Sequence, residues 1–165
     1  MNVCFRPAVM EELPEIMAIY ARARQFMKET GNPTQWGDTH PSKEAVRGDI
    51  ERQQSIVCVI DGQIEGVFYL AEGADPTYDV IEDGAWHSDR PYHTIHRIAS
   101  SGRVRGVFSR CVDWAHENYG YLRIDTHEQN IPMQNALKKQ HFTRRGVIYI
   151  HDGTPRLAYD KIKEN

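Results

Sequence analysis

The sequence lacks the features that mark several common classes of protein. Its 3 cysteines lie far apart and form no CxxC pair, so we expect reduced, buried thiols and no disulfide framework. No run approaches about 18 consecutive apolar residues, which excludes a membrane-spanning helix. The amino-terminal segment is too short and too polar for a secretory signal peptide. These absences favour a cytoplasmic protein without a membrane partner.

An excess of positive charge is also lacking. The chain carries 20 basic and 23 acidic side chains, for a formal net charge of −3, and it has no dense tract of lysine or arginine. Proteins that bind nucleic acid normally show a basic stripe, so we expect no nucleic-acid partner. Internal repeats, low-complexity segments and Gly/Ser-rich linkers are absent as well. We therefore expect a single domain over residues 1–165.

The hydrophobic pattern alternates between the periods of strands and helices. Apolar, β-branched runs predict strands at residues 3–5, 55–60, 64–70, 94–100, 121–125, 142–150 and 156–159. Apolar residues at helical spacing predict helices that begin near residues 11, 43, 107 and 130. Asp61-Gly62, between two strands, predicts a tight hairpin. Because hairpins mix with strand–helix–strand units, we expect an α/β fold (α+β mixed) whose sheet is mixed rather than purely parallel.

The segment from His96 to Gly106 is the strongest candidate for a binding site. It has the pattern of a strand, a turn of small residues and the start of a helix. Such a connection presents free backbone N–H groups and the positive end of a helix, which suit phosphate oxygens. Arg103, Arg105 and Arg110 would add positive charge nearby. The segment is neither a Walker loop nor GxGxxG, and a plain strand-to-helix connection with solvated arginines is the alternative.

Over essentially the whole chain, the element order and two motifs resemble the GNAT (GCN5-related) N-acetyltransferase family. The main family motif is a strand of the type apolar-Ala-Val, then x-Pro-x-x-Arg-Gly-x-Gly-x-Gly at the start of a helix. Ile98-Ala99-Ser100 matches the strand, and Arg105-Gly106 matches Arg-Gly. Phe108 and Arg110 replace the second and third glycines. A register shifted by two residues, with Arg103 at the arginine, is the alternative.

The second family motif reads Asn-x-x-(small or apolar)-x-x-Leu-Tyr-x-x-x-Gly-Phe. Asn130, Met133 and Phe142 fall on it, whereas Leu137 stands at the tyrosine. In the family the asparagine commonly contacts the cofactor, and the tyrosine often protonates the leaving thiolate. Asn130 is also suited to cap the helix that follows it. If Leu137 leaves the site without an acid, Tyr149 on a neighbouring strand is the first candidate to replace it.

The resemblance implies a mostly antiparallel central sheet of about seven strands, flanked by about four helices. It also implies acetyl-CoA (coenzyme A) as co-substrate, direct attack of an amine on the thioester, and no metal. The residues that this resemblance assigns to acetyl-CoA are Ile98, Ala99, Ser100, Arg105, Gly106, Val107, Phe108, Ser109, Arg110 and Asn130. A non-catalytic acyl-CoA-binding or ligand-sensing module on the same fold is the alternative function.

A base must take a proton from the acceptor amine, because a protonated amine is no nucleophile. His96 and His127 are the catalytic candidates. Alternation along the strand 94–100 would put His96 on the same face as Ile98 and Ser100, toward the reaction centre. The same alternation separates His93 from His96, so their His-x-x-His spacing does not predict a metal site.

The acceptor is expected to be a small-molecule or peptide amine, and the chain could form a homodimer. Trp36 and Trp86 lie in loops that often border the acceptor pocket in this family, or they cap the core. The acidic segment from residue 72 to 91, which includes Asp75 and Glu82, is either a solvated loop or a lining that favours a cationic amine.

Overall fold

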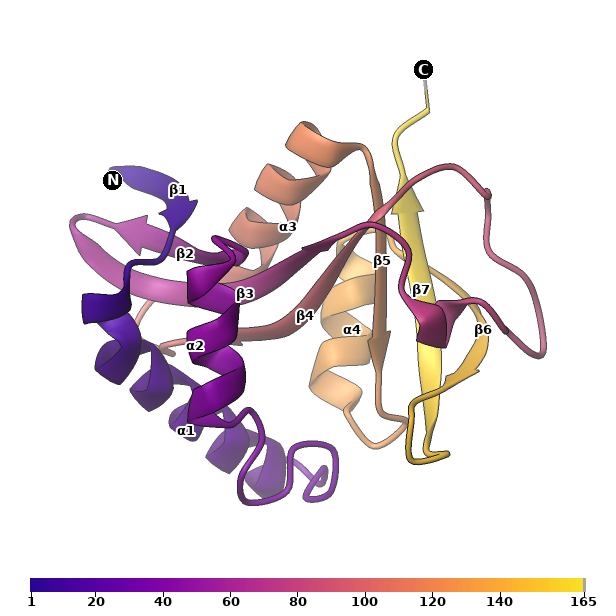
Figure 1. Ribbon diagram of the computed structural model, residues 1–165, viewed down its shortest axis with the longest axis horizontal. Coiled ribbons are helices and arrows are strands. Elements are labelled where there is room, and N and C mark those ends of the chain that lie inside the picture. Colours follow the sequence, from indigo (N-terminus) through magenta and orange to yellow (C-terminus); the bar gives the residue numbers. More distant parts are fainter. Residues whose placement is uncertain (165) are drawn as a thin grey trace.

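The computed structural model describes residues 1–164, which Figure 1 shows as a ribbon. The strands are β1 (Val3–Pro7), β2 (Ser55–Ile60), β3 (Gln63–Glu72), β4 (His93–Ser100), β5 (Tyr121–Thr126), β6 (Thr143–Tyr149) and β7 (Pro155–Ile162). The α-helices are α1 (Leu13–Glu29), α2 (Lys43–Glu51), α3 (Val107–Tyr119) and α4 (Ile131–Lys139). Two short 3₁₀ helices are η1 (Met10–Glu12) and η2 (Pro76–Tyr78). The predicted order of strands and α-helices is confirmed.

The strands form one seven-stranded sheet in the order β1-β2-β3-β4-β5-β7-β6. Every neighbouring pair is antiparallel except β4 and β5, which are parallel. The sheet is therefore mixed and mostly antiparallel, as predicted. The β2–β3 hairpin turns at Asp61 and Gly62, whose φ angles of 50° and 83° are those of a tight two-residue turn.

The parallel pair β4–β5 is joined at one end only. Its register contains two pairs, His93 with Leu122 and Thr94 with Arg123. Beyond Thr94 the two strands diverge, as Figure 1 shows, while β4 stays paired with β3 as far as Ser100. Within residues 1–164, the β5-facing edge of β4 therefore has no strand partner from residue 95 onward. The backbone groups of such an edge are free to bond a ligand.

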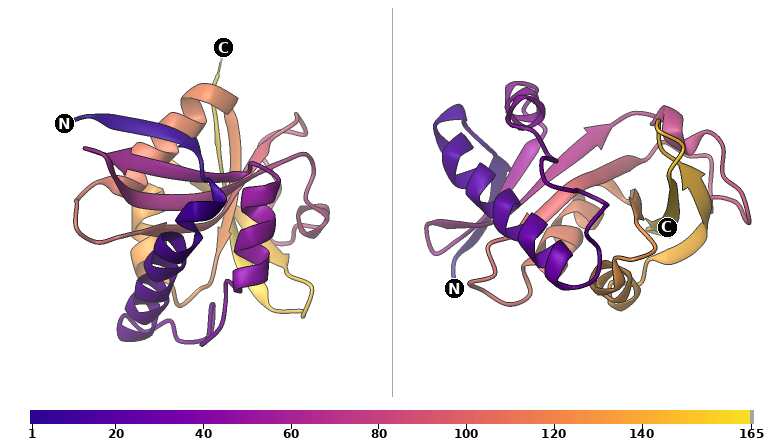
Figure 2. Two further views of the ribbon diagram at one scale, coloured as in Figure 1. Left: turned by 60° about the vertical axis from the view of Figure 1, so that its left-hand side comes forward. Right: turned by 90° about the horizontal axis from the view of Figure 1, so that it is seen from below.

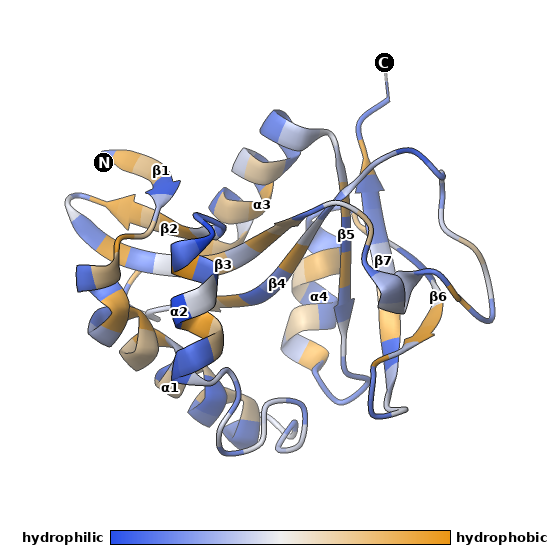
Figure 3. Cartoon of the chain, viewed as in Figure 1, coloured by the Kyte–Doolittle hydropathy of each residue, from blue (hydrophilic) through white to orange (hydrophobic). Residues whose placement is uncertain are grey.

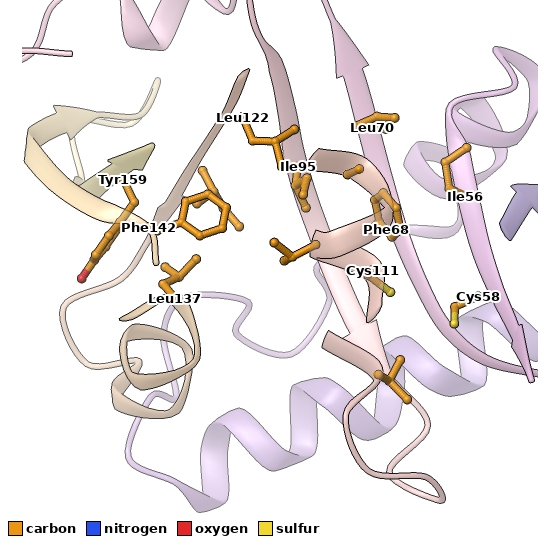
Figure 4. Packing of buried hydrophobic residues seen from close by; sticks show 14 of the residues in the cluster. Ile56, Cys58, Phe68, Leu70, Ile95, Cys111, Leu122, Leu137, Phe142 and Tyr159 are labelled. Atoms are coloured by element: carbon orange, nitrogen blue, oxygen red, sulfur yellow. The ribbon is translucent and has the colours of Figure 1, made fainter. Parts of the chain in front are cut away.

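Helices cover both faces of the sheet, as the two views of Figure 2 show. One apolar cluster joins α1 and α2 to one face, and a second joins α3 and α4 to the other. Burial on both sides explains the continuous apolar run of β2, which is coloured hydrophobic in Figure 3. Val57 belongs to the first cluster, and Ile56 and Cys58 belong to the second, part of which Figure 4 shows.

The three cysteines are free, and two of them are buried as predicted. Cys58 and Cys111 lie in the cluster under α3. Cys4 is exposed, so the expectation that all three are buried is wrong. Its neighbours Val3 and Phe5 pack against the core, so alternation along the edge strand β1 turns the Cys4 side chain to the other face.

Two segments differ from their predicted form. The helix expected from Glu11 begins as η1, and α1 starts at Leu13 with Pro14 in its first turn, where proline is best tolerated. The acidic segment from 72 to 91 is not simply a solvated loop, because η2 lies within it and Glu82 forms a bridge with Val147 of β6. No helix in residues 1–164 has both the length and the apolar character needed to cross a membrane.

Candidate functional site

A narrow groove of about 190 Å³ lies where β4 and β5 separate. Its walls come from α1, β4 and the first turns of α3 and α4. The lining residues are Arg22, Ala23, Phe26, Met27, Ile98, Ala99, Ser100, Val107, Phe108, Asn130, Pro132, Met133 and Ala136. This lining contains six of the residues predicted to hold the cofactor, namely Ile98, Ala99, Ser100, Val107, Phe108 and Asn130. The sequence motifs therefore converge on one apolar groove.

The remaining predicted cofactor residues surround the amino terminus of α3, outside this lining. They are Arg105, Gly106, Ser109 and Arg110. Gly106 precedes the helix with a φ of 77°, and a Cβ there would meet no atom of residues 1–164 within 4 Å. Within the same residues no side chain caps this helix, and the first backbone N–H groups of a helix have no partner within it. Such an end can bind an anion, so the phosphate site stays a prediction.

At the amino terminus of α3, one of the three predicted arginines points elsewhere, and an arginine from α1 takes its place. Arg103 is turned away, because its guanidinium bonds the carboxylate of Glu65 and the backbone oxygen of Ile64. Arg22 of α1 stands there instead, with Nη1 3.4 Å from the Ser100 oxygen. A side chain at Gly102 would collide with the Arg22 guanidinium, so glycine at this position admits the arginine. The sequence offered no local signal for Arg22, which comes from a distant helix.

A larger cavity of about 560 Å³ adjoins the groove. It is lined by residues of β4, β5, the start of β7 and the loops around them, including His40, Asp75, His96, Arg97, Asp125, Thr126, His127, His151, Asp152 and Arg156. Four residues line both spaces, namely Met27, Ile98, Asn130 and Met133. Molecules bound in the groove and in the cavity would therefore meet at this junction.

The side chain of His96 lines the cavity and lies on the opposite face of the sheet from the side chain of Ile98. The pairing of β4 with β3 is irregular next to Tyr69, and Arg97 has a φ of 51°. His96 stacks on Tyr69 with ring centroids 5.9 Å apart, whereas Ile98 packs with the cluster under α3. The prediction that the two share a face is wrong, because a β-bulge breaks the alternation of side chains. His96 nevertheless lines the cavity.

Asp75 holds the imidazole of His96. Nε2 of His96 lies 3.1 Å from Oδ2 of Asp75, whose Oδ1 accepts from the N–H and hydroxyl of Thr77 at 2.9 and 2.7 Å. The hydrogen bond from His96 is the main reason that the pKa of Asp75 falls to about 2. An ionised carboxylate can only accept, so Nε2 carries a proton and Nδ1 is the nitrogen left to take one.

His127 also lines the cavity, but its hydrogen bonding differs. Its Nδ1 accepts from the backbone N–H of Gln129 at 3.0 Å, so the neutral ring carries its proton on Nε2. Burial lowers the pKa of His127, and the charge of Arg156 lowers it further. His127 is therefore arranged as a neutral hydrogen-bond donor, and of the two predicted histidines only His96 has a ring nitrogen free to accept a proton.

No tyrosine from residues 1–164 lines the groove or the cavity. Leu137, which occupies the motif's tyrosine position, is fully buried and lies against Phe142 in the core (Figure 4). Tyr149 is 43% exposed and its hydroxyl bonds Glu82, so it lies outside the site. The expectation that Tyr149 could serve as the acid is wrong, because its strand position faces solvent.

Asn130 acts as the cap of α4. Its Oδ1 accepts from the Met133 N–H at 3.1 Å, and its Nδ2 donates to Gln35 at 3.0 Å. Its place in both linings keeps a cofactor contact as a prediction. Trp36 borders the cavity, whereas Trp86 packs against Tyr78 and is not part of the lining.

His93 stacks on Tyr119 at 4.1 Å, away from the cavity that His96 lines. The two histidines therefore lie apart, as the alternation predicted. The part of the chain that the structure describes groups no three His, Cys, Asp or Glu side chains around a point that could hold a metal ion.

A scan against protein-family models and a search of curated proteins found no match. Solved structures do match. An acetyltransferase of the GNAT family from Streptococcus agalactiae is 33% identical, with a TM-score of 0.90 over 100% of this chain and 98% of that one. A GNAT-family acetyltransferase from Listeria monocytogenes is 18% identical, with a TM-score of 0.71 over 97% and 94%. The yncA protein of Salmonella typhimurium, solved with its cofactor acetyl-CoA, is 13% identical, with a TM-score of 0.62 over 100% and 96%.

The last two likenesses concern the fold alone. The first is of another kind, since a third of the residues are identical along the full length of both chains. Together with the diverging β4 and β5 and the motifs that meet in the groove between them, it shows that this chain belongs to the GNAT family of acetyltransferases.

Proposed function

We propose that the protein is an acetyl-CoA-dependent N-acetyltransferase that acts on a primary amine. The observation that carries this proposal is the junction of the groove with the larger cavity at Met27, Ile98, Asn130 and Met133. The apolar groove borders a free backbone edge that could hold a thioester arm, and the cavity contains His96, the candidate base. A transferase needs both substrates to meet in this way.

Acetyl-CoA would lie with its pantetheine arm along the unpaired edge of β4. Its pyrophosphate would bind the free N–H groups at the start of α3, where the helix dipole is positive. Arg22, Arg105 and Arg110 would add positive charge around it. The yncA protein, which shares this fold, was solved with its cofactor acetyl-CoA, and that agrees with the assignment.

The acceptor amine would enter from the cavity. Its nitrogen attacks the thioester carbonyl carbon, the new C–N bond forms, and the C–S bond breaks to release the CoA thiolate. The proton lost by the nitrogen passes to Nδ1 of His96, directly or through one water, while Asp75 holds Nε2. A backbone N–H on the free edge of β4 would stabilise the oxyanion. A thiol has an ordinary pKa near 8.5, so the thiolate can leave without a tyrosine to protonate it.

The test is turnover with purified protein, acetyl-CoA and a panel of primary amines and short peptides. Release of free thiol that depends on the amine, together with an acetylated product seen by mass spectrometry, would support the proposal. Thiol release without an amine is hydrolysis and would not. Binding of acetyl-CoA in calorimetry with no turnover would favour the non-catalytic binding module, and no binding at millimolar CoA would end the cofactor assignment.

A further inference from the structure

The guanidinium of Arg156 is buried in the cavity wall with most of its donors unused. The side chain is 8% exposed. Within residues 1–164, its one hydrogen bond goes to the neighbouring backbone oxygen of Pro155, at 3.2 Å. Asp125 Oδ1 stands 4.0 Å from Nε, which is too far for a hydrogen bond. A guanidinium has five N–H donors, so the wall presents an undersatisfied cation to the cavity.

Two other arginines of the interior differ from Arg156. Arg97, which is partly buried and also lines the cavity, makes three contacts of 2.7 to 3.1 Å with the carboxylate of Asp49. Arg123 bonds the Ser88 oxygen and lies over the ring of Tyr92. Leaving the N–H donors of a buried charge without hydrogen-bond acceptors is costly, and the carboxylate of Asp125 at 4.0 Å supplies none, so the exception at Arg156 needs a physical reason. A negatively charged ligand group in the cavity would supply one.

Other groups of the cavity add hydrogen-bond donors. Thr126, which is paired with Leu157 across β5 and β7, is 1% exposed, lines the same cavity as Arg156, and has a hydroxyl without a partner in residues 1–164. His127 follows it and carries its proton on Nε2. The positive charge of Arg156 also contributes to the lowered pKa of both His40 and His127. This part of the cavity therefore offers hydrogen-bond donors and a cation, beside the carboxylates of Asp125 and Asp152.

The proposed base, His96, lines the same cavity as Arg156. Behind the lining, Tyr78 links the two regions, since its ring centroid is 6.3 Å from that of His96 and its hydroxyl bonds Asp125 at 2.7 Å. Asp125 in turn stands beside Arg156. One molecule in the cavity could therefore present an amine to His96 and a second group to Arg156.

We propose that Arg156 binds a carboxylate of the acceptor, so that the acceptor is an amine that carries its own carboxylate, as a free amino acid does. The proposal rests on the proposed function and names its substrate class. The fork of an arginine matches the two oxygens of a carboxylate, and this geometry discriminates against a neutral group in the same position. Simple amines lack such a carboxylate, and at a peptide amino terminus the neighbouring carboxyl group is tied up in an amide.

The experiment compares each of the L-amino acids with its carboxamide. The carboxamide differs only in the lost charge, and its amine is the weaker base, so a preference for the acid cannot come from a larger fraction of free amine. We expect kcat/KM to be about 10- to 100-fold higher for the preferred acid than for its amide. Arg156→Gln should remove this preference by raising KM with kcat within a few fold, because a binding interaction made equally in the ground and transition states is lost.

Arg144→Gln is the matched control, because Arg144 is exposed on the adjoining strand β6 and outside the cavity. It should keep the preference, and acetyl-CoA affinity should be the same in all variants. If Arg156→Gln does not fold, Arg156→Lys should fold and show a preference reduced by about tenfold, since lysine keeps the charge but not the fork.

Equal rates on acids and amides, or an unchanged preference in Arg156→Gln, would overturn the carboxylate assignment alone. So would a protein that binds acetyl-CoA and acetylates peptides or simple amines but none of the amino acids. A protein that does not bind acetyl-CoA would instead contradict the proposed function.

Discussion

His96 and His127 differ in which ring nitrogen is occupied, and we therefore expect different roles from them. His96 has Nε2 bonded to Asp75 and Nδ1 available, whereas His127 has Nδ1 occupied by the Gln129 N–H. We predict that His96→Ala lowers kcat/KM roughly a hundredfold or more, the usual contribution of a general base, and flattens its rise with pH. His127→Ala, the matched control, should cost much less. Equal losses in steady-state assays of the two variants would refute the assignment.

Asp75 links the site to the stability of the fold. Its pKa is lowered to about 2, chiefly by the hydrogen bond from His96, so its carboxylate stabilises the folded state above the unfolded pKa near 3.9. That stabilisation is lost as the pH falls through the folded value. We predict that Asp75→Asn reduces the free energy of unfolding by up to about 2 kcal/mol at pH 7 and by progressively less between pH 4 and pH 2. Urea titrations across this range measure it, and a difference that does not change with pH would count against the carboxylate.

At the scale of the element, the first turn of α3 should distinguish charge from geometry. Gly106 has a φ of 77° and open space around it. Asparagine and aspartate both tolerate this conformation and both cap helices well, so the two variants should fold alike. We predict that Gly106→Asp weakens CoA binding about tenfold relative to Gly106→Asn, because its carboxylate would stand beside the phosphates. Calorimetry with CoA gives the comparison, and equal affinities would show that the phosphates bind elsewhere.

The same helix packs closely against the sheet because β3 has a glycine, with no side chain, at the point of contact. A Cβ at Gly66 of β3 would lie 2.5 Å from Cγ1 of Val107, the first residue of α3. We predict that Gly66→Ala costs about 1 to 3 kcal/mol of unfolding free energy through overpacking. Combining it with Val107→Ala should cost less than the sum of the two single changes, because the second removes the colliding methyl group. Additive losses in thermal unfolding would contradict this contact.

The elements themselves could be predicted from the sequence, and their finer geometry could not. Periodicity located the strands and helices because burial on one or two faces leaves a local pattern, as in β2 and α1. The bulge in β4 depends on how β3 pairs with it, so simple alternation misplaced His96 relative to Ile98. The motif aligned Leu137 with a tyrosine, but only packing reveals that this position faces the core.

Groups that reach the site from distant segments had no local signal at all. Arg22 comes from α1, and Arg156 comes from β7. A lone arginine in a strand is ordinary in sequence, and the role that we propose for Arg156 rests on its burial and on the hydrogen bonds that it does not make. Such features emerge only when the sheet is assembled.

At the scale of the whole molecule, the sheet is weakest along the line between β4 and β5, because two residue pairs join these strands. A cofactor lying in the divergence would contact both sides of that line. We predict that acetyl-CoA at about 100 times its Kd adds about 2.7 kcal/mol to the free energy of unfolding. Hydrogen exchange should slow most at residues 95 to 100 and at β5. A thermal shift without local protection there would place the ligand elsewhere.

The ends of the chain lie on opposite sides of that line, with β1 in one part of the sheet and β7 in the other. Tension applied between the termini would therefore pull β4 and β5 apart before it could shear the long antiparallel pairs on either side. In an optical trap, β4 and β5 should separate first, at a low force. With acetyl-CoA bound across the β4–β5 pairing, the rupture force should rise. A force measurement would then report whether the cofactor site is occupied.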